Sequence, residues 1–159
     1  MYAAGCRDAV YVPDNQLSHV LAEIGERYRD VRLALATREE EAVGIAAGLY
    51  LGGRRPAVLL QSSGLGNALN AVTSLVVPYQ IPMLIVVSMR GDVGEWNAAQ
   101  VPMGRAVRPI LDAIGIAHAT IESPADAERI VALTAATAFG TRMAAACLVP
   151  RRITSAPAP

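Results

Sequence analysis

The chain has no lysine: all 14 basic side chains among its 159 residues are arginine, and 14 acidic side chains bring the formal net charge to zero. Without an excess of positive charge it carries no electrostatic footprint for nucleic acid or for an acidic membrane surface. Its two cysteines, Cys6 and Cys147, are too few and too far apart in the sequence for a disulfide framework. Reduced thiols in a cytosol are therefore expected.

Long apolar runs are also missing. No run approaches the roughly 20 residues that cross a membrane, and no basic segment followed by a long apolar one marks a signal peptide at the N-terminus. The overall composition is nevertheless apolar, with 53% hydrophobic and only 18% charged residues. A chain of this size with so few charges is expected to bury part of its surface against another chain.

Short apolar runs of strand length alternate with segments of helical periodicity. Strands are predicted over residues 9–12, 31–36, 56–61, 82–88, 118–121 and 144–149, and helices over residues 15–28, 39–51, 67–76, 105–114 and 123–140. This alternation predicts an α/β three-layer sandwich, with a mostly parallel six-stranded sheet covered by helices on both faces. The domain is expected to span residues 1–150, and the Pro- and Ala-rich residues 151–159 are expected to form a flexible tail.

In such sheets, ligands bind beyond the carboxyl ends of the strands. Four predicted loops lie there, at residues 13–16, 37–39, 61–70 and 88–104, and they hold nearly every unusual polar residue of the chain. These loops are therefore the place to search for a site.

Three glutamates open the helix at residue 39. Acidic residues in a first helical turn are stabilised by the helix dipole and need no other role. Glu39, however, shares a helix face with Ala42, Val43 and Ala46, whereas Glu40 and Glu41 point toward solvent. An inward carboxylate is costly unless it is paired with a ligand or a donor, so both interpretations stay open on spacing alone.

Two other loops have ordinary explanations. The segment "QSSGLGNALN" lacks the third glycine of a dinucleotide fingerprint and the lysine of a P-loop, so it also reads as a tight turn with Asn67 capping the next helix. In "VPDNQL", Asp14 or Asn15 is a candidate cap for the helix that follows. No cluster has metal-ligand spacing, and no Ser-His-Asp set is evident.

Taken together and in order, these stretches resemble a known family: the α subunit of sulfopyruvate decarboxylase and the related N-terminal part of phosphonopyruvate decarboxylase. These are thiamine diphosphate enzymes, and the likeness is to their pyrimidine-binding domain. The resemblance covers roughly residues 9–110. It is carried by five motifs: "VPDNQL", "REEEAVGIAAGLYLGG", "QSSGLGNALNAVTSL", "IPMLIVVSMRG" and "EWNAAQVPMG".

The resemblance implies roles for particular residues. Glu39 matches the glutamate that hydrogen-bonds the aminopyrimidine ring and activates the cofactor for attack on the keto carbon of a 2-oxo acid, which then loses CO2. The turn that lines the cofactor pocket corresponds to Gln61, Ser62, Ser63, Gly64 and Asn67.

For the substrate, the resemblance implies contacts from Asp14, Asn15, Arg90 and Gln100, with proton transfer as a further role for Asp14. Arg90 is the candidate ligand of a sulfonate or phosphonate, the alternative being an ion pair with Asp92 or Glu95. Phosphonopyruvate decarboxylases tend to carry a histidine after the glutamine of the last motif. Here Val101 follows Gln100, which favours 3-sulfopyruvate or another 2-oxo acid.

The Gly-Asp-Gly…Asn motif that holds the diphosphate and Mg²⁺ in this cofactor class is missing from the sequence. The resemblance therefore implies a partner β subunit that binds both, in an α2β2 or higher assembly, with no metal ligands on this chain. Two alternatives remain open: a thiamine diphosphate-dependent carboligase subunit of a specialised biosynthetic pathway, and a non-catalytic scaffold subunit of the same fold.

Overall fold

A computed structural model describes residues 1–154 of the chain. Six strands form one sheet in the order β2-β1-β3-β4-β6-β5, and every neighbouring pair is parallel. The strands are β1 (Asp8–Tyr11), β2 (Arg32–Leu35), β3 (Pro56–Gln61), β4 (Leu84–Ser88), β5 (Ala117–Thr120) and β6 (Ala145–Val149). The predicted α/β class and the parallel six-stranded sheet are confirmed.

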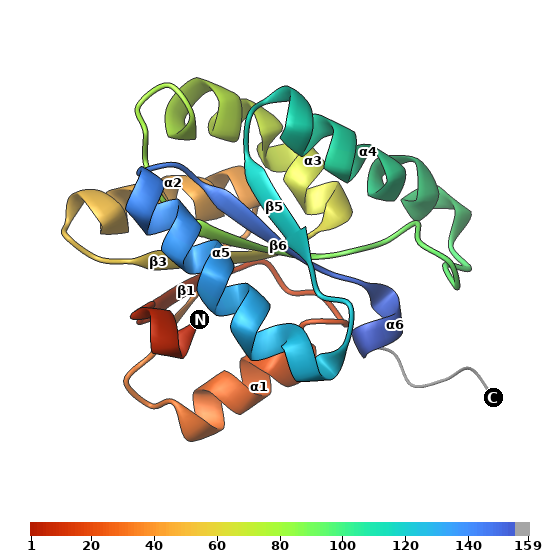
Figure 1. Ribbon diagram of the computed structural model, residues 1–159, viewed down its shortest axis with the longest axis horizontal. Coiled ribbons are helices and arrows are strands. Elements are labelled where there is room, and N and C mark those ends of the chain that lie inside the picture. The colour runs from red at the N-terminus through yellow and green to blue at the C-terminus, as the bar shows by residue number, and fades with distance from the viewer. Residues whose placement is uncertain (155–159) are drawn as a thin grey trace.

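Helices cover both faces of this sheet (Figure 1). They are α1 (Ser18–Arg27), α2 (Glu39–Leu51), α3 (Ser62–Ala71), α4 (Val101–Ala113), α5 (Ala127–Thr141) and α6 (Arg151–Thr154). One core cluster packs α2, α3 and α4 against one face of the sheet, and a second packs α1 and α5 against the other. The result is the expected three-layer sandwich.

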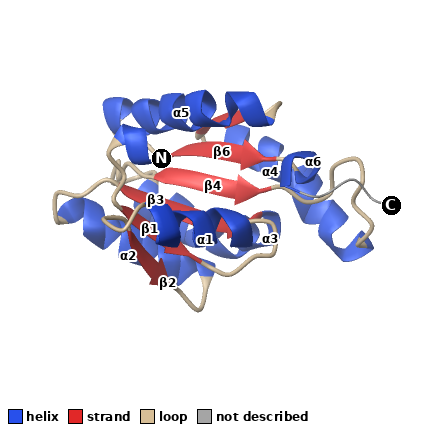
Figure 2. Ribbon diagram, turned by 90° about the horizontal axis from the view of Figure 1, so that it is seen from below, coloured by secondary structure: helices blue, strands red, loops and turns tan. Residues whose placement is uncertain are grey.

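The strands form where the apolar runs predicted them. The inner strands β4 and β6 are buried along their whole length, as parallel strands covered on both faces must be. The edge strands β2 and β5 are partly exposed. The arrowheads of β4 and β6 point toward the end of the molecule that carries α6 (Figure 2), so the loops that follow these strands gather there.

Two helices begin earlier than their sequence pattern predicts. Helix α3 starts at Ser62, directly after β3, and a π-helical turn over Val72–Val76 continues it. The expected glycine turn is therefore the first turn of a helix. Helix α4 starts at Val101, after a short 3-10 turn over Ala98–Gln100, and not at residue 105.

The C-terminal segment departs from the expected flexible tail. Residues 151–154 form the short helix α6, and the hydroxyl of Thr154 donates a hydrogen bond to Oε1 of Gln16, 3.1 Å away. The rest of the expected tail, residues 155–159, lies outside the described residues. No helix within residues 1–154 combines the length and the apolar character needed to cross a membrane.

Candidate functional site

Strands β1, β3 and β4 are neighbours in the sheet, so the loops after them meet at its carboxyl edge. Tyr11 ends β1, Gln61 ends β3 and Ser88 ends β4, and Gln61 and Ser88 lie side by side in the register. This adjacency brings together segments that are up to 76 residues apart in the sequence.

Glu39 is the first residue of α2 and is buried, with 8% of its surface exposed. One carboxylate oxygen, Oε2, accepts a hydrogen bond from Nδ2 of Asn67 at 3.1 Å. Glu41 is exposed and bonded to Thr37, whose hydroxyl and N–H lower the pKa of that carboxyl. The predicted contrast between an inward Glu39 and an outward Glu41 is confirmed.

Gly64 lets α3 lie directly on the Glu39 carboxylate. A Cβ placed on Gly64 would stand 2.6 Å from Oε1 of Glu39 and 2.7 Å from its Cγ, which is too close for any side chain. Asn67 lies one turn further along α3 and does not cap it, so the capping interpretation is wrong. Asn67 instead donates to one oxygen of the Glu39 carboxylate, and the missing side chain of Gly64 leaves room for the other.

Ser62 faces the other way, into the protein. Its hydroxyl is fully buried, donates to the carbonyl of Ser88 at 3.3 Å and accepts the N–H of Arg90 at 2.9 Å. These bonds tie the start of α3 to the segment after β4. Ser63, the next residue, is half-buried.

Asp14 and Arg90 form an ion pair, with Nη2 of Arg90 2.6 Å from Oδ1 of Asp14. The other oxygen of Asp14 accepts the hydroxyl of Ser88 at 2.8 Å and the N–H of Gln16 at 3.1 Å. Helix α1 begins only at Ser18 and has no side-chain cap, so neither Asp14 nor Asn15 caps it.

The two alternative partners of Arg90 are engaged elsewhere. Asp92 pairs with Arg108 at 3.4 Å, and Glu95 lies 3.8 Å from Arg151. The alternative interpretation, an ion pair of Arg90 with Asp92 or Glu95, is therefore wrong. The side chain of Arg90 turns back across the sheet edge toward the loop after β1.

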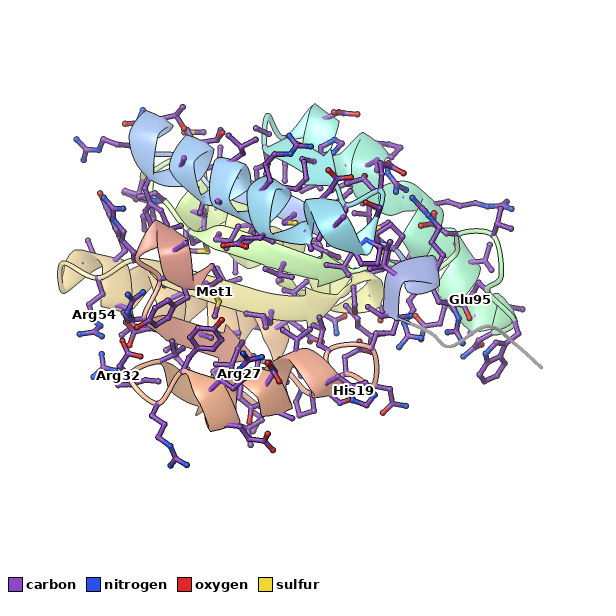
Figure 3. The ribbon with its side chains drawn as sticks, turned by 60° about the horizontal axis from the view of Figure 1, so that its bottom comes forward. Met1, His19, Arg27, Arg32, Arg54 and Glu95 are labelled. Carbon is purple, nitrogen blue, oxygen red and sulfur yellow. The ribbon has the colours of Figure 1, made fainter. Side chains whose placement is uncertain are left out.

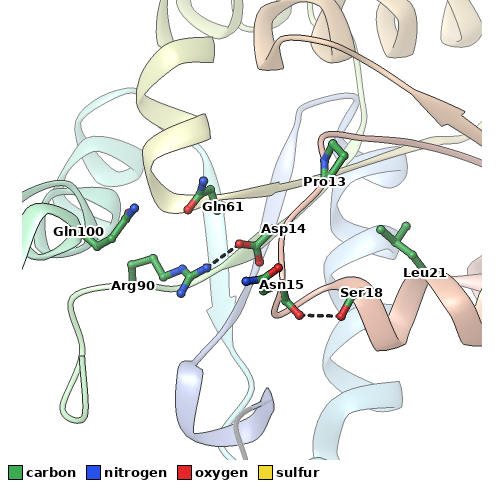
Figure 4. Close-up of a pocket in the computed structure, with 8 residues that line it drawn as sticks. All are labelled: Pro13, Asp14, Asn15, Ser18, Leu21, Gln61, Arg90 and Gln100. Atoms are coloured by element: carbon green, nitrogen blue, oxygen red, sulfur yellow. Dashed lines mark hydrogen bonds and ion pairs between the residues drawn. The ribbon is translucent and has the colours of Figure 1, made fainter. Parts of the chain in front are cut away.

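A cavity of about 390 Å³ opens at this edge (Figure 4). Its lining includes all four residues predicted to contact a substrate, together with Gln61 from the predicted cofactor set; the full lining is Pro13, Asp14, Asn15, Ser18, Leu21, Gln61, Arg90 and Gln100. Glu39, Gly64 and Asn67 are not part of it. Gly64 and Asn67 lie on α3, the helix that begins directly after the cavity-lining Gln61, and both contact Glu39 at the start of α2.

Three buried polar atoms of cavity-lining residues have no hydrogen-bond partner within residues 1–154: Oε1 of Gln61, Oε1 of Gln100 and Nε of Arg90. Buried polar atoms without partners are rare in folded proteins, and each one costs free energy. Small rotations of these side chains toward a ligand with complementary polar groups would satisfy them. The cavity is therefore the best candidate for a binding site.

Sequence reasoning missed Ser88 and Gly104. Ser88 reads as the last residue of an apolar strand, yet its hydroxyl holds Asp14. Gly104 packs against the carbonyl of Arg90 so closely that a Cβ there would overlap it. The glycine in "VPMGR" was the only available signal for that contact, and glycine alone does not specify what it touches.

The described part of the chain, residues 1–154, contains no group of three or more His, Cys, Asp or Glu side chains that could hold a metal ion. Both cysteines are free and buried. Burial raises the pKa of the Cys147 thiol to about 11 and also raises the pKa of Cys6.

The family described as "Thiamine pyrophosphate enzyme, N-terminal TPP binding domain" matches residues 1–102. The α subunit of sulfopyruvate decarboxylase from Methanococcus maripaludis is 42% identical over 120 residues, covering 76% of this chain and 71% of that protein. Its counterpart from Methanothermobacter thermautotrophicus is 44% identical, covering 82% of this chain and 79% of that one.

Phosphonopyruvate decarboxylase from Streptomyces viridochromogenes is 38% identical over 60% of this chain, a match that covers only 23% of that longer protein. Among solved structures, a 2-oxoglutarate:ferredoxin oxidoreductase from Magnetococcus marinus superposes with a TM-score of 0.75, covering 94% of this chain and 27% of that one. At 14% identity this last likeness concerns the fold alone.

Proposed function

The chain belongs to the family of sulfopyruvate decarboxylase α subunits, and we propose that it forms one half of a thiamine diphosphate-dependent enzyme that decarboxylates 3-sulfopyruvate. The observation that carries the proposal is the Glu39 carboxylate: it is buried, held by Asn67 and lies on Gly64, at the edge of the sheet where the cavity opens. Burying a carboxylate is costly, and Asn67 is the one side-chain donor to Glu39 within residues 1–154, so a ligand that donates a further hydrogen bond would stabilise it.

The residues around Glu39 fit the aminopyrimidine ring of the cofactor. Bound thiamine diphosphate supplies the electron sink for the loss of CO2 from a 2-oxo acid. Glu39 would accept a hydrogen bond from the ring and hold a proton there, while Asn67 and Gly64 fix the carboxylate in place. Gln61 and Ser63 would line the ring pocket, and Ser62, whose hydroxyl is used within the protein, would support it from behind.

The cavity fits a small anionic substrate. 3-Sulfopyruvate carries a carboxylate and a sulfonate, and Arg90 is the one basic residue in the cavity lining. Its guanidinium suits a sulfonate or a phosphonate, since it presents several donors in a planar fork. The side-chain amides of Asn15, Gln61 and Gln100 supply the remaining polar contacts.

Sulfopyruvate is favoured over phosphonopyruvate by the comparisons. The relatives named for sulfopyruvate are more similar to this chain, and over more of their own length, than the one named for phosphonopyruvate. Val101 after Gln100 points the same way, because the histidine typical of phosphonopyruvate decarboxylases is missing there.

We infer a separate β subunit that holds the diphosphate and Mg²⁺. The similar relatives are named as α subunits, and the phosphonopyruvate relative is a longer protein of which this chain matches only part. The assembly would be α2β2 or higher, with the active site between α and β chains. The two free thiols support a reducing, cytoplasmic location.

The first test is to tag this chain in its native host and identify what co-purifies. A β chain carrying the Gly-Asp-Gly…Asn motif is expected in stoichiometric amount. The purified complex, supplied with thiamine diphosphate and Mg²⁺, should release CO2 from 3-sulfopyruvate faster than from 3-phosphonopyruvate or pyruvate.

Other outcomes lead to other functions. Carbon–carbon bond formation from pyruvate and an aldehyde, without net release of free aldehyde from 3-sulfopyruvate, would favour the carboligase alternative. A chain that purifies alone, with no thiamine diphosphate bound, would reject the two-chain enzyme and leave the scaffold subunit as the better account.

A further inference from the structure

We propose that Asp14 acts in this site through Arg90: it is a positioning residue that holds the guanidinium at the cavity wall, and it does not exchange a proton with the substrate. The inference rests on the proposed function, because it assigns the recognition of the substrate's sulfonate to Arg90. It replaces the proton-transfer role that the family resemblance allows for Asp14.

The carboxylate of Asp14 is fully engaged by the chain's own donors. It receives three hydrogen bonds, from Nη2 of Arg90, the hydroxyl of Ser88 and the N–H of Gln16, and only 3% of its side chain is exposed. Each oxygen has at least one strong partner. A carboxylate that moves a proton must turn an oxygen toward the reacting atoms, and Asp14 would have to break the ion pair or the Ser88 bond to do so.

Arg90 is held from several directions. Its backbone N–H donates to the hydroxyl of Ser62, and its backbone carbonyl lies against Gly104. Its guanidinium binds Asp14. The next residue, Gly91, has a φ of +74° and packs against the backbone of Val101, which fixes the chain at that point. This bracing is what an arginine needs if it is to meet an anion in one fixed orientation.

The guanidinium keeps donors free for a ligand. Arginine has five N–H groups, and Asp14 takes one of them. The Nε–H of Arg90 is buried and has no partner within residues 1–154, and the 15% of the side chain that is exposed lies at the wall of the cavity. Among residues 1–154, Asp14 and Arg90 are the only charged residues that line that cavity. The free edge of Arg90 is therefore the anion-binding group, and Asp14 aims it (Figure 4).

A double-mutant cycle on the αβ complex tests this assignment. Asp14→Asn is expected to raise KM for 3-sulfopyruvate about tenfold and to leave kcat within about threefold of the wild-type value. The substitution weakens substrate binding but does not remove a group that takes part in the decarboxylation step. Arg90→Met should raise KM by about 100-fold or more. The double variant should be no worse than Arg90→Met, since Asp14 has nothing left to position.

Two results would overturn the proposal. In the first, the loss of kcat/KM in the double variant equals the product of the losses in the two single variants, so that the two residues act independently. The second is a kcat in Asp14→Asn that falls about 100-fold or more, with one limb of its pH profile lost.

Ser88→Ala provides a second variant that leaves both charges in place. Loss of the Ser88 hydroxyl loosens Asp14, so KM should rise several-fold with kcat and its pH profile unchanged. Ser74→Ala is the matched control, because Ser74 is exposed and bonds only to Asn70. An effect of Ser88→Ala on kcat alone would count against the positioning role.

A binding measurement removes the dependence on turnover. Sulfoacetate has a carboxylate and a sulfonate but no keto group, so its binding to the complex can be followed by calorimetry. Asp14→Asn and Arg90→Met should both weaken it, and unchanged binding by Asp14→Asn would overturn the inference. Failure of the wild-type complex to decarboxylate 3-sulfopyruvate would instead reject the proposed function, a different result from any in the mutant series.

Discussion

The two ends of the sheet each carry a buried aspartate paired with arginine, and they differ in what surrounds the pair. At the amino end, Asp8 is 4% exposed and binds Arg32 at 2.7 Å and also Arg54. At the carboxyl end, Asp14 binds Arg90. Figure 3 shows Arg32 and Arg54 close together at one end of the molecule, with Glu95 at the opposite end.

The pair at the amino end connects three strands. Asp8 opens β1, Arg32 opens β2, and Arg54 precedes β3, so the cluster ties the starts of neighbouring strands together. Both arginines keep a large part of their side chains in solvent, 61% and 39%. No buried polar side-chain atom of these three residues lacks a partner.

The pair at the carboxyl end lies beside polar atoms that have no partner, on Gln61, Gln100 and Arg90 itself. Each such atom costs about 1–3 kcal/mol if it stays unsatisfied, so this end is built at the expense of stability. The same two residue types thus tie strands together at one end and line the proposed substrate site at the other. The two ends differ in whether buried polar atoms without a partner lie near the ion pair, and not in the ion pair itself.

Among substitutions that leave every charge in place, the largest effect is expected from Gly64→Ala, at the carboxyl end of the sheet. A methyl group there displaces the Glu39 carboxylate, and a shift of about 1 Å in a catalytic group costs on the order of 100-fold in kcat/KM. Gly48→Ala, on the helix that begins with Glu39, is the control: nothing lies within 4 Å of a Cβ at that position. The control should keep full activity, and equal losses in both variants would mean that the helices, not the carboxylate, are disturbed.

An intermediate effect is expected at the opposite end. Asp8→Asn should lower the free energy of unfolding by about 2 kcal/mol, because it removes a buried charge from two arginines. Urea denaturation of the purified complex measures the loss. The decarboxylation rate per folded complex should be unchanged, and a selective loss of activity would erase the contrast between the two ends.

The smallest expected effect is a loss of stability at high pH, caused by the buried thiol of Cys147. The thiol of Cys147 has a folded-state pKa of about 11, above its ordinary value of 9.0, because burial disfavours the thiolate. Below pH 9 it is protonated in both states. As the pH rises from 9 toward 11 it ionises only in the unfolded chain, and at pH 10 this lowers the free energy of unfolding by about 1 kcal/mol.

Urea unfolding of the wild type and of Cys147→Ala at pH 8 and pH 10 isolates this contribution. The wild type should lose about 1 kcal/mol more than the variant between the two pH values. Equal losses would show that the thiol is not shielded as its burial implies.

The strands and the position of Glu39 could be predicted from the sequence because both follow from local periodicity. Apolar runs place β3 at the same residues in the prediction and in the structure, and the helical stripe turns Glu39 inward. The start of α3 could not be predicted, since "SSG" is typical of turns. In the structure this segment is the first turn of a helix, and its Gly64 packs against Glu39, a contact that local sequence does not specify.

The sequence could predict which loops lie at the carboxyl edge of the sheet, but not which of their side chains line the cavity. Arg90 pairs with Asp14 and not with the nearby Asp92, because the order of β1, β3 and β4 brings the first loop alongside the segment after β4. Nothing in the local sequence of either residue encodes that order. The roles of Ser62 and Ser88, which brace the pair from within, depend on the same adjacency.

The proposed decarboxylase activity depends most directly on the Glu39 carboxylate, and one matched comparison tests this dependence. Glu39→Gln and Glu41→Gln would each be assembled with the β subunit and assayed with thiamine diphosphate, Mg²⁺ and 3-sulfopyruvate. Glu39→Gln should lose about 1,000-fold or more in kcat, with assembly intact. Glu41→Gln, on the solvent side of the same helical turn, should retain nearly full activity. Undiminished turnover by Glu39→Gln would contradict the account.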